Sequence, residues 1–125
     1  MVGADIAVFE DDPGIRASLS LLLEFMGHRV VAEAASREEA IEVVGSWDNE
    51  TEPDVLILDG NLGSPAESAD AIAIVAAIGE RGLHEHLRII GFAGKPMPAT
   101  ILPFLAADPT KEGGPSELMK IIEEL

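Results

Sequence analysis

The chain has 125 residues, the commonest size for a single domain, and 47% of them are hydrophobic, which is enough for one core. Its formal charge of −15, from 23 acidic and 8 basic residues, argues against direct nucleic-acid binding, because that surface needs clustered lysine and arginine. The lack of cysteine excludes disulfides and thiol chemistry. No segment reads as a signal peptide or a membrane span, so we expect a cytoplasmic protein.

The first half of the chain reads as strand, helix, strand, helix, strand. An apolar run over residues 5–10 predicts the first strand, and Pro13, at a first helical position where a missing N–H is harmless, opens a helix. A second strand is expected over residues 29–34, and Ser36 opens the second helix as part of a capping box. Residues 55–58 are apolar throughout, which predicts a central parallel strand buried on both faces.

The second half continues the alternation with weaker signals. The expected elements are a helix, a strand, a short helix, a strand and a final helix, at residues 70–82, 88–92, 98–105, 106–110 and 115–125. Pro109 lies within the last of these strands. Because proline would interrupt a central strand, we expect this strand at an edge of the sheet.

Five strands that alternate with five helices predict an α/β fold. The strands would form a doubly wound parallel sheet with helices on both faces, since parallel strands need crossover connections. We treat residues 1–125 as one domain, with no output domain in this chain. In such sheets ligands bind beyond the carboxyl ends of the strands, which is where functional residues are sought.

Carboxylates follow two of the predicted strands. Glu10, Asp11 and Asp12 come after the first strand, and Asp59 comes directly after the third. Carboxylates placed together raise one another's pKa, and a divalent cation with oxygen ligands relieves that cost. Mg²⁺ also coordinates phosphate oxygens. The residues therefore predict a cation site beside an aspartate that can attack phosphorus.

Two segments resemble the receiver domains of two-component response regulators. They are Val-Phe-Glu-Asp-Asp-Pro-Gly at residues 8–14 and Val-Leu-Ile-Leu-Asp at residues 55–59. The resemblance covers the chain in element order, and its motifs are specific in the first half and weak in the second. It implies a flavodoxin-like fold with strand order 2-1-3-4-5 and five flanking helices.

The resemblance also implies roles for individual residues. Glu10 and Asp11 would be the acidic pair that holds Mg²⁺, and Asp59 would be both the phosphoacceptor and a metal ligand. Asn61 would supply a backbone carbonyl to the metal. Lys111 would contact a phosphoryl oxygen, as the family lysine after the fifth strand does.

Several positions depart from the family pattern. Phe92 is aligned with the threonine or serine that ends the fourth strand in receivers, and no hydroxyl occurs over residues 88–99. Phe92 could fill the core or plug the pocket. Asp108 stands where the aromatic switch residue is expected, and the loop over residues 60–67 is longer than usual. Lys95 precedes a proline, as the family lysine does, but follows the fourth strand too closely to be that lysine.

Three functions are compatible with this pattern. The first is a phosphoacceptor that takes its phosphoryl group from a sensor histidine kinase or a phosphotransfer protein and signals to a downstream protein through a non-standard switch. The second is a pseudo-receiver that binds proteins regardless of phosphorylation. The third, a phosphohydrolase similar to the haloacid dehalogenase family, is disfavoured because Asn61 replaces the second aspartate of that family, so we do not expect an enzyme. The histidines at positions 84 and 86 are expected in an exposed loop and not in a metal site.

Overall fold

Four parallel strands form one sheet in the computed structural model, which describes residues 1–64, 66–83 and 86–125. The strands are β1 (Asp5–Phe9), β2 (Arg29–Ala34), β3 (Val55–Leu58) and β4 (Arg88–Gly91), in the order β2-β1-β3-β4. The helices are α1 (Pro13–Phe25), α2 (Arg37–Gly45), α3 (Ala69–Glu80) and α4 (Gly114–Glu124). Within the described ranges, no helix has both the length and the apolar character that crossing a membrane requires. The doubly wound, flavodoxin-like α/β class is confirmed.

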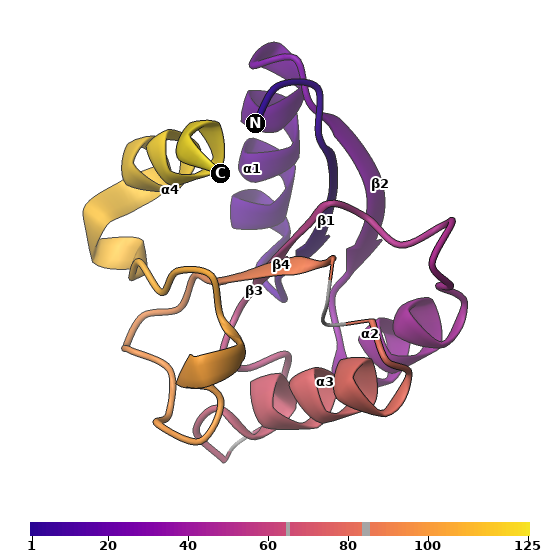
Figure 1. Cartoon of the computed structure of the whole chain (residues 1–125). Helices are drawn as coiled ribbons and strands as arrows, with labels where there is room; N and C mark the ends of the chain where they lie inside the picture. Colours follow the sequence, from indigo (N-terminus) through magenta and orange to yellow (C-terminus); the bar gives the residue numbers. More distant parts are fainter. Residues whose placement is uncertain (65, 84–85) are drawn as a thin grey trace.

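Helices cover both faces of this sheet, α1 and α4 on one and α2 and α3 on the other (Figure 1). Side chains of a strand point alternately to the two faces, so each strand contributes to two cores. Phe9 and Leu58 are fully buried against the α2 and α3 side, where Phe9 stacks on Trp47 with ring centroids 5.9 Å apart. Val8 and Ile57 are buried on the α1 and α4 side. Burial on both faces explains why β3 is apolar at every position.

The helix starts follow the capping signals of the sequence. The Asp12 carboxylate accepts hydrogen bonds from the N–H groups of Gly14 and Ile15, at 2.8 and 3.0 Å, and so caps α1. The Ser36 hydroxyl accepts from the Glu39 N–H at 3.2 Å and caps α2. Both cap residues have extended backbone, with φ of −77° and −139°. These caps place the first residues of each helix directly after a strand end.

The region after β4 is less regular than the sequence predicted. The expected fifth strand, residues 106–110, is reduced to two isolated parallel bridges, Ile90 with Ala107 and Ala93 with Thr110. Pro109 has no N–H with which to extend a ladder. The expected helix over residues 98–105 is reduced to the 3₁₀ turn η1 (Leu102–Phe104), and a second 3₁₀ turn, η2 (Lys111–Gly113), precedes α4.

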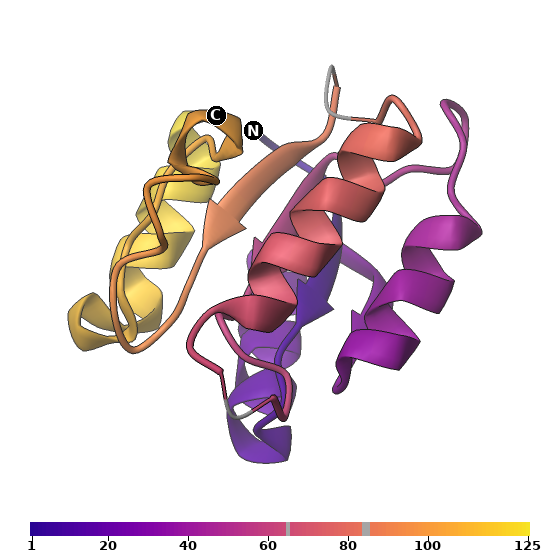
Figure 2. The same ribbon diagram turned by 90° about the horizontal axis from the view of Figure 1, so that it is seen from below.

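A proline explains the missing helix. The N–H of Leu102 reaches back to the carbonyl of Pro98 at 3.3 Å, as in a helical turn. The next residue, Pro103, cannot donate the hydrogen bond that would continue the ladder. The prediction of five strands and five helices is therefore corrected to four strands and four helices within the described residues, with a rudimentary fifth strand at the edge next to β4 (Figure 2).

Candidate functional site

The carboxyl ends of β1 and β3 bring the predicted acidic residues together. Phe9 pairs with Leu58 in the parallel ladder, so the next residues, Glu10 and Asp59, lie side by side at the edge of the sheet. The Asp59 N–H donates to the Phe9 carbonyl at 3.0 Å and fixes this register. One carboxylate oxygen from each of Glu10, Asp11 and Asp59 lies within 4.8 Å of the others. The three predicted metal ligands with carboxylate side chains thus form one cluster.

Lys111 reaches the same cluster from the far side of β4. Its N–H donates to the Ala93 carbonyl at 2.8 Å, which ties the start of η2 to the chain just after β4. Its Nζ lies 2.7 Å from Glu10 Oε1 and 3.2 Å from Asp59 Oδ2. Lys95 is instead 77% exposed and pairs with Glu67 at 3.7 Å. Of the two lysines considered from the sequence, the structure places Lys111 against the acidic residues.

The electrostatics of the cluster show that its carboxylates are crowded. Glu10 is 2% exposed, and burial, followed by its hydrogen bond to Asp59, raises the pKa of Glu10 to about 7. Lys111 and the Asp12 N–H oppose that shift. Burial alone would lower the pKa of Lys111, but its contacts with Glu10 and Asp59 outweigh burial and raise it. Near neutral pH the cluster can therefore exchange a proton for a cation.

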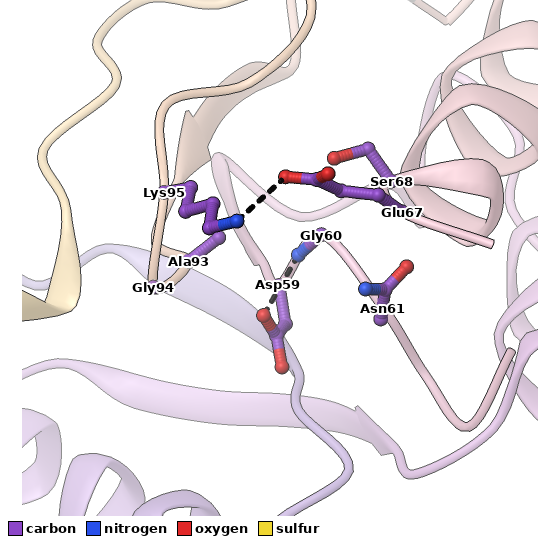
Figure 3. Close-up of a pocket in the computed structure, with 8 residues that line it drawn as sticks. All are labelled: Asp59, Gly60, Asn61, Glu67, Ser68, Ala93, Gly94 and Lys95. Carbon is purple, nitrogen blue, oxygen red and sulfur yellow. Dashed lines mark hydrogen bonds and ion pairs between the residues drawn. The ribbon is translucent and has the colours of Figure 1, made fainter. Parts of the chain in front are cut away.

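A cavity of about 240 Å³ opens beside Asp59 (Figure 3). It is lined by Asp59, Gly60, Asn61, Glu67, Ser68, Ala93, Gly94 and Lys95. Asp59 Oδ1 accepts the Gly60 N–H at 2.8 Å. Asn61 Oδ1 is buried and has no hydrogen-bond partner among the described residues. The cavity has room for a tetrahedral phosphoryl group attached to Asp59.

The residue that faces this cavity from β4 is Ala93, not Phe92. Phe92 is 3% exposed and packs in the core on the α1 and α4 side. Ala93, the next residue, points the other way and lines the cavity. Phe92, the residue aligned from the sequence with the receiver hydroxyl, therefore does not line this cavity. Phe92 fills the core, and the cavity wall at the end of β4 carries a methyl group.

Asp70 is a residue of the site region that sequence reasoning missed. It is 1% exposed, and it accepts hydrogen bonds from the N–H groups of Leu62 and Ser64, at 2.6 and 3.0 Å, and from Arg37 Nε at 2.6 Å. Burial would raise its pKa, but these donors together hold the pKa below its usual value. Asp70 therefore anchors the loop that follows Asp59. An acid within the otherwise apolar first turn of a buried helix was the signal available in the sequence.

The remaining sequence expectations concern Asp108 and the histidines. Asp108, which the sequence aligns with the family's aromatic residue, accepts the Met97 N–H at 2.9 Å through Oδ2. It holds the segment after β4 and offers no aromatic ring. His84 and Glu85 lie outside the described residues, and His86 is exposed. Among the described residues, the group suited to a metal ion is the cluster of Glu10, Asp11 and Asp59.

Comparison with known proteins supports one fold. No family model and no curated relative matches the sequence. A two-component response regulator of the LuxR family from an Aurantimonas species is similar in structure, with 29% identity and a TM-score of 0.73 over 97% of this chain and 83% of that one. A DNA-binding response regulator of the LuxR family from Staphylococcus aureus has 20% identity and a TM-score of 0.75 over 97% of each chain.

A third similar structure is a receiver domain protein. It is a CheY-like response regulator receiver domain protein from Methanospirillum hungatei, with 19% identity and a TM-score of 0.71 over 93% of this chain and 88% of that one. At identities near 20%, such likeness shows the fold and not the activity. The parallel sheet with helices on both faces superposes on these proteins over most of its length. The chain therefore has the receiver fold of two-component response regulators and is a divergent example of it.

Proposed function

We propose that this chain is a phosphoacceptor signalling domain of a two-component system, with Asp59 as the acceptor. The observation that carries the proposal is the meeting of Glu10, Asp11, Asp59 and Lys111 at one edge of the sheet. Carboxylates for a cation and an ammonium for phosphoryl oxygens are what phosphoryl transfer to an aspartate requires, because its catalysis consists mainly of positioning and charge stabilisation.

The donor set fits Mg²⁺. The cluster offers hard oxygen ligands, the kind this ion prefers, and Mg²⁺ normally keeps several waters and binds phosphate oxygens. Burial, and then the hydrogen bond and charge of Asp59, raise the pKa of Glu10, and a divalent cation would stabilise the charged carboxylates. Glu10, Asp11 and Asp59 would hold the ion, with the backbone carbonyl of Asn61 as a further ligand. When bound, it would neutralise charge on the phosphoryl oxygens.

The chain's own residues then perform the transfer. A carboxylate oxygen of Asp59 attacks the phosphorus of a phosphohistidine, the new P–O bond forms, and the P–N bond breaks. Its electron pair goes to the imidazole nitrogen, and a ring protonated on its other nitrogen leaves as neutral imidazole. Lys111, already 3.2 Å from Asp59 Oδ2, can follow the negative charge onto a phosphoryl oxygen. The cavity beside Asp59 receives the phosphoryl group.

The proposal implies protein partners and no enzymatic turnover. The donor would be a sensor histidine kinase or a phosphotransfer protein, and the phosphorylated domain would act on a downstream protein in the cytoplasm. The aspartyl phosphate is a signal that forms once per cycle and is not a step toward releasing a product. The surface, with its net charge of −15, suits basic partner patches.

A phosphorylation experiment tests the acceptor. Incubation with acetyl phosphate and Mg²⁺ should add the mass of one phosphoryl group in intact-protein mass spectrometry. Asp59→Asn should abolish the addition, whereas Asp5→Asn, a matched control at the opposite end of β1, should retain it. An increment that persists in Asp59→Asn, or no increment in the unchanged protein at saturating donor and Mg²⁺, would contradict the proposal.

One observation favours the second candidate, a pseudo-receiver that binds partners regardless of phosphorylation. Phe92 and Asp108 are aligned from the sequence with the hydroxyl and the aromatic ring of receivers, so two parts of the usual response are replaced. A pseudo-receiver would show no mass increment and would bind its partner equally well as Asp59→Asn. The phosphorylation experiment therefore separates the two functions.

A further inference from the structure

Ser68 precedes α3 at the position where a serine usually caps a helix, but it makes no capping bond. Asp12 and Ser36, which cap α1 and α2, have extended backbone and accept helix N–H groups. Ser68 has φ 59° and ψ 11°, in the left-handed region, and its side chain accepts no hydrogen bond from α3. Among the described residues it is the one non-glycine with a positive φ. The chain therefore keeps a strained residue here and forgoes a cap.

The side chain of Ser68 lies at the candidate site, and its hydroxyl does not cap α3. Ser68 is 9% exposed and lines the same cavity as Asp59 (Figure 3). In the described part of the chain the hydroxyl forms no hydrogen bond within the protein, unlike the Ser36 hydroxyl, which caps α2. The hydroxyl is therefore available to donate to a group bound in this cavity.

Ser68 and Ala93 flank the same backbone. A Cβ placed on Gly60, the residue after Asp59, would lie 3.4 Å from Ser68 Oγ and 3.4 Å from Ala93 Cβ. The hydroxyl therefore lies near the methyl group of Ala93, in the segment that follows β4. Gly60 leaves the space between them open. Ser68 can therefore supply the hydroxyl that is missing at the end of β4.

A phosphoryl group on Asp59 needs several donors. One of its oxygens can face the cation cluster and a second can face Lys111, whose Nζ is already 3.2 Å from Asp59. A third extends into the cavity, where a donor is required because an unpaired charged oxygen in a buried site is costly. Lys95, at the rim, is exposed and paired with Glu67. Ser68 offers a hydroxyl donor on the cavity wall.

We propose that Ser68 is the hydroxyl of this receiver, and that its Oγ–H donates a hydrogen bond to an oxygen of the phosphoryl group on Asp59. The inference rests on the proposed function of Asp59. It assigns the recognition of the phosphoryl group to the loop before α3 in place of the strand end. The left-handed backbone of Ser68 keeps its hydroxyl away from the N–H groups of α3. A cap residue with extended backbone would direct its hydroxyl to those N–H groups.

Beryllofluoride, a stable mimic of the phosphoryl group, provides the test. With Mg²⁺ present, Ser68→Ala and Ser68→Gly should each weaken beryllofluoride binding about tenfold or more, the effect expected for losing a hydrogen bond to a charged group. Ser68→Gly relieves the positive φ, so it should be folded at least as well as the unchanged protein. Ser64→Ala removes a hydroxyl from the same loop but outside this cavity, and should bind normally.

A rescue variant separates a binding role from a structural one. Ala93→Ser added to Ser68→Gly returns a hydroxyl to the cavity from the strand end, and should recover most of the lost affinity. A purely structural role for Ser68 would not respond to that change.

The outcomes distinguish this inference from the proposed function. If the unchanged protein neither binds beryllofluoride nor gains a phosphoryl group, both are overturned. If the unchanged protein binds beryllofluoride and gains a phosphoryl group, and Asp59→Asn does neither, the proposed function stands. Both Ser68 variants binding like the unchanged protein would then overturn the role of Ser68 alone, and so would a loss that Ala93→Ser fails to recover.

Discussion

The two sides of the candidate site are held by different kinds of structure. On one side, β1 is paired in continuous parallel ladders with β2 and β3, and the N–H groups of Glu10 and Asp59 donate to carbonyls of neighbouring strands at 3.0 Å. On the other side, the chain beyond β4 makes two isolated bridges and two 3₁₀ turns. Lys111 reaches the site from this second side.

This difference separates Asp59, the proposed acceptor, from the residues that could respond to its phosphorylation. The carboxylates of Glu10 and Asp59 are positioned by the register of a buried sheet, which opens only at high free energy. Lys111 and Ala93 belong to segments with few regular backbone hydrogen bonds, which open more easily. Chemistry on the rigid side can therefore bias the position of the irregular side, which is the arrangement a switch needs.

The largest expected effect comes from removing the lysine that joins the two sides. Lys111→Met leaves the buried carboxylates of Glu10 and Asp59 without their ammonium partner. At pH 8 in chelator we expect a loss of about 3 kcal/mol in the free energy of unfolding, measured with urea, because a broken ion pair leaves uncompensated charge. Phosphorylation by acetyl phosphate should also fall sharply.

An exposed lysine provides the control for this experiment. Lys120→Met, on the solvent side of α4, removes the same charge far from the carboxylates and should change the free energy of unfolding by less than about 0.5 kcal/mol. Equal losses in the two variants would mean that Lys111 does not join the two sides of the site.

The next largest effect comes from protonation of Glu10, on the rigid side of the site. The pKa of Glu10 rises from 4.5 in the unfolded chain to about 7 in the folded one, so the native state binds more protons between these values. Stability should therefore fall as the pH rises through this window, by up to about 3 kcal/mol, and level off above it. Glu10→Gln should flatten the curve in chelating buffer, as measured by urea unfolding from pH 5 to 8.

Two other carboxylates test that assignment. Glu124→Gln, at the exposed end of α4, should leave the slope unchanged. The contribution of Asp70 to the pH dependence of stability has the opposite sign, because the pKa of Asp70 is lowered in the folded state. Its contribution is present above its unfolded pKa of 3.8 and is lost as the pH falls through its lower folded value. A slope between pH 5 and 8 that survives Glu10→Gln would contradict the role of Glu10.

The rigid side was also the side that the sequence predicts well. Apolar runs that end in Glu10 and in Asp59 indicate parallel strands, and the carboxyl ends of such strands meet at one edge whatever the details of the loops. The positions of Glu10, Asp11 and Asp59 therefore follow from local patterns. The caps at Asp12 and Ser36 are local patterns too, and they predict the helix starts.

The structure of the irregular side could not be predicted from local sequence patterns. Side chains alternate along a strand, so neighbouring residues face opposite sides, and the sequence alone left open whether Phe92 fills the core or plugs the pocket. The anchoring of the loop by Asp70 and the position of Ser68 in the cavity wall depend on a loop conformation without periodicity. Pro109 indicated an edge strand from the sequence alone. That Pro103 would reduce the expected helix over residues 98–105 to a 3₁₀ turn became clear only in the structure.

The smallest expected effect tests how closely the irregular side is fitted to β4. Asp108 lies directly over Gly91, so a Cβ at position 91 would overlap with Asp108 Oδ1 and would come within 3.0 Å of Met97 Cγ. Asp108 cannot simply rotate away, because its Oδ2 accepts the Met97 N–H at 2.9 Å. Gly91→Ala should therefore push the segment after β4 outward and lower the free energy of unfolding by about 1 to 2 kcal/mol.

Two further variants show whether that loss arises from the contact between Gly91 and Asp108. Gly79→Ala, in α3, meets no atom within 4 Å and should stabilise the protein by up to about 1 kcal/mol. Asp108→Ala removes the obstacle, so the double variant with Gly91→Ala should be more stable than the sum of the two single changes implies, as a double-mutant cycle in urea would measure. Additive losses would mean that the segment beyond β4 is already loose, and the two sides of the site would then differ even more than their backbone hydrogen bonds indicate.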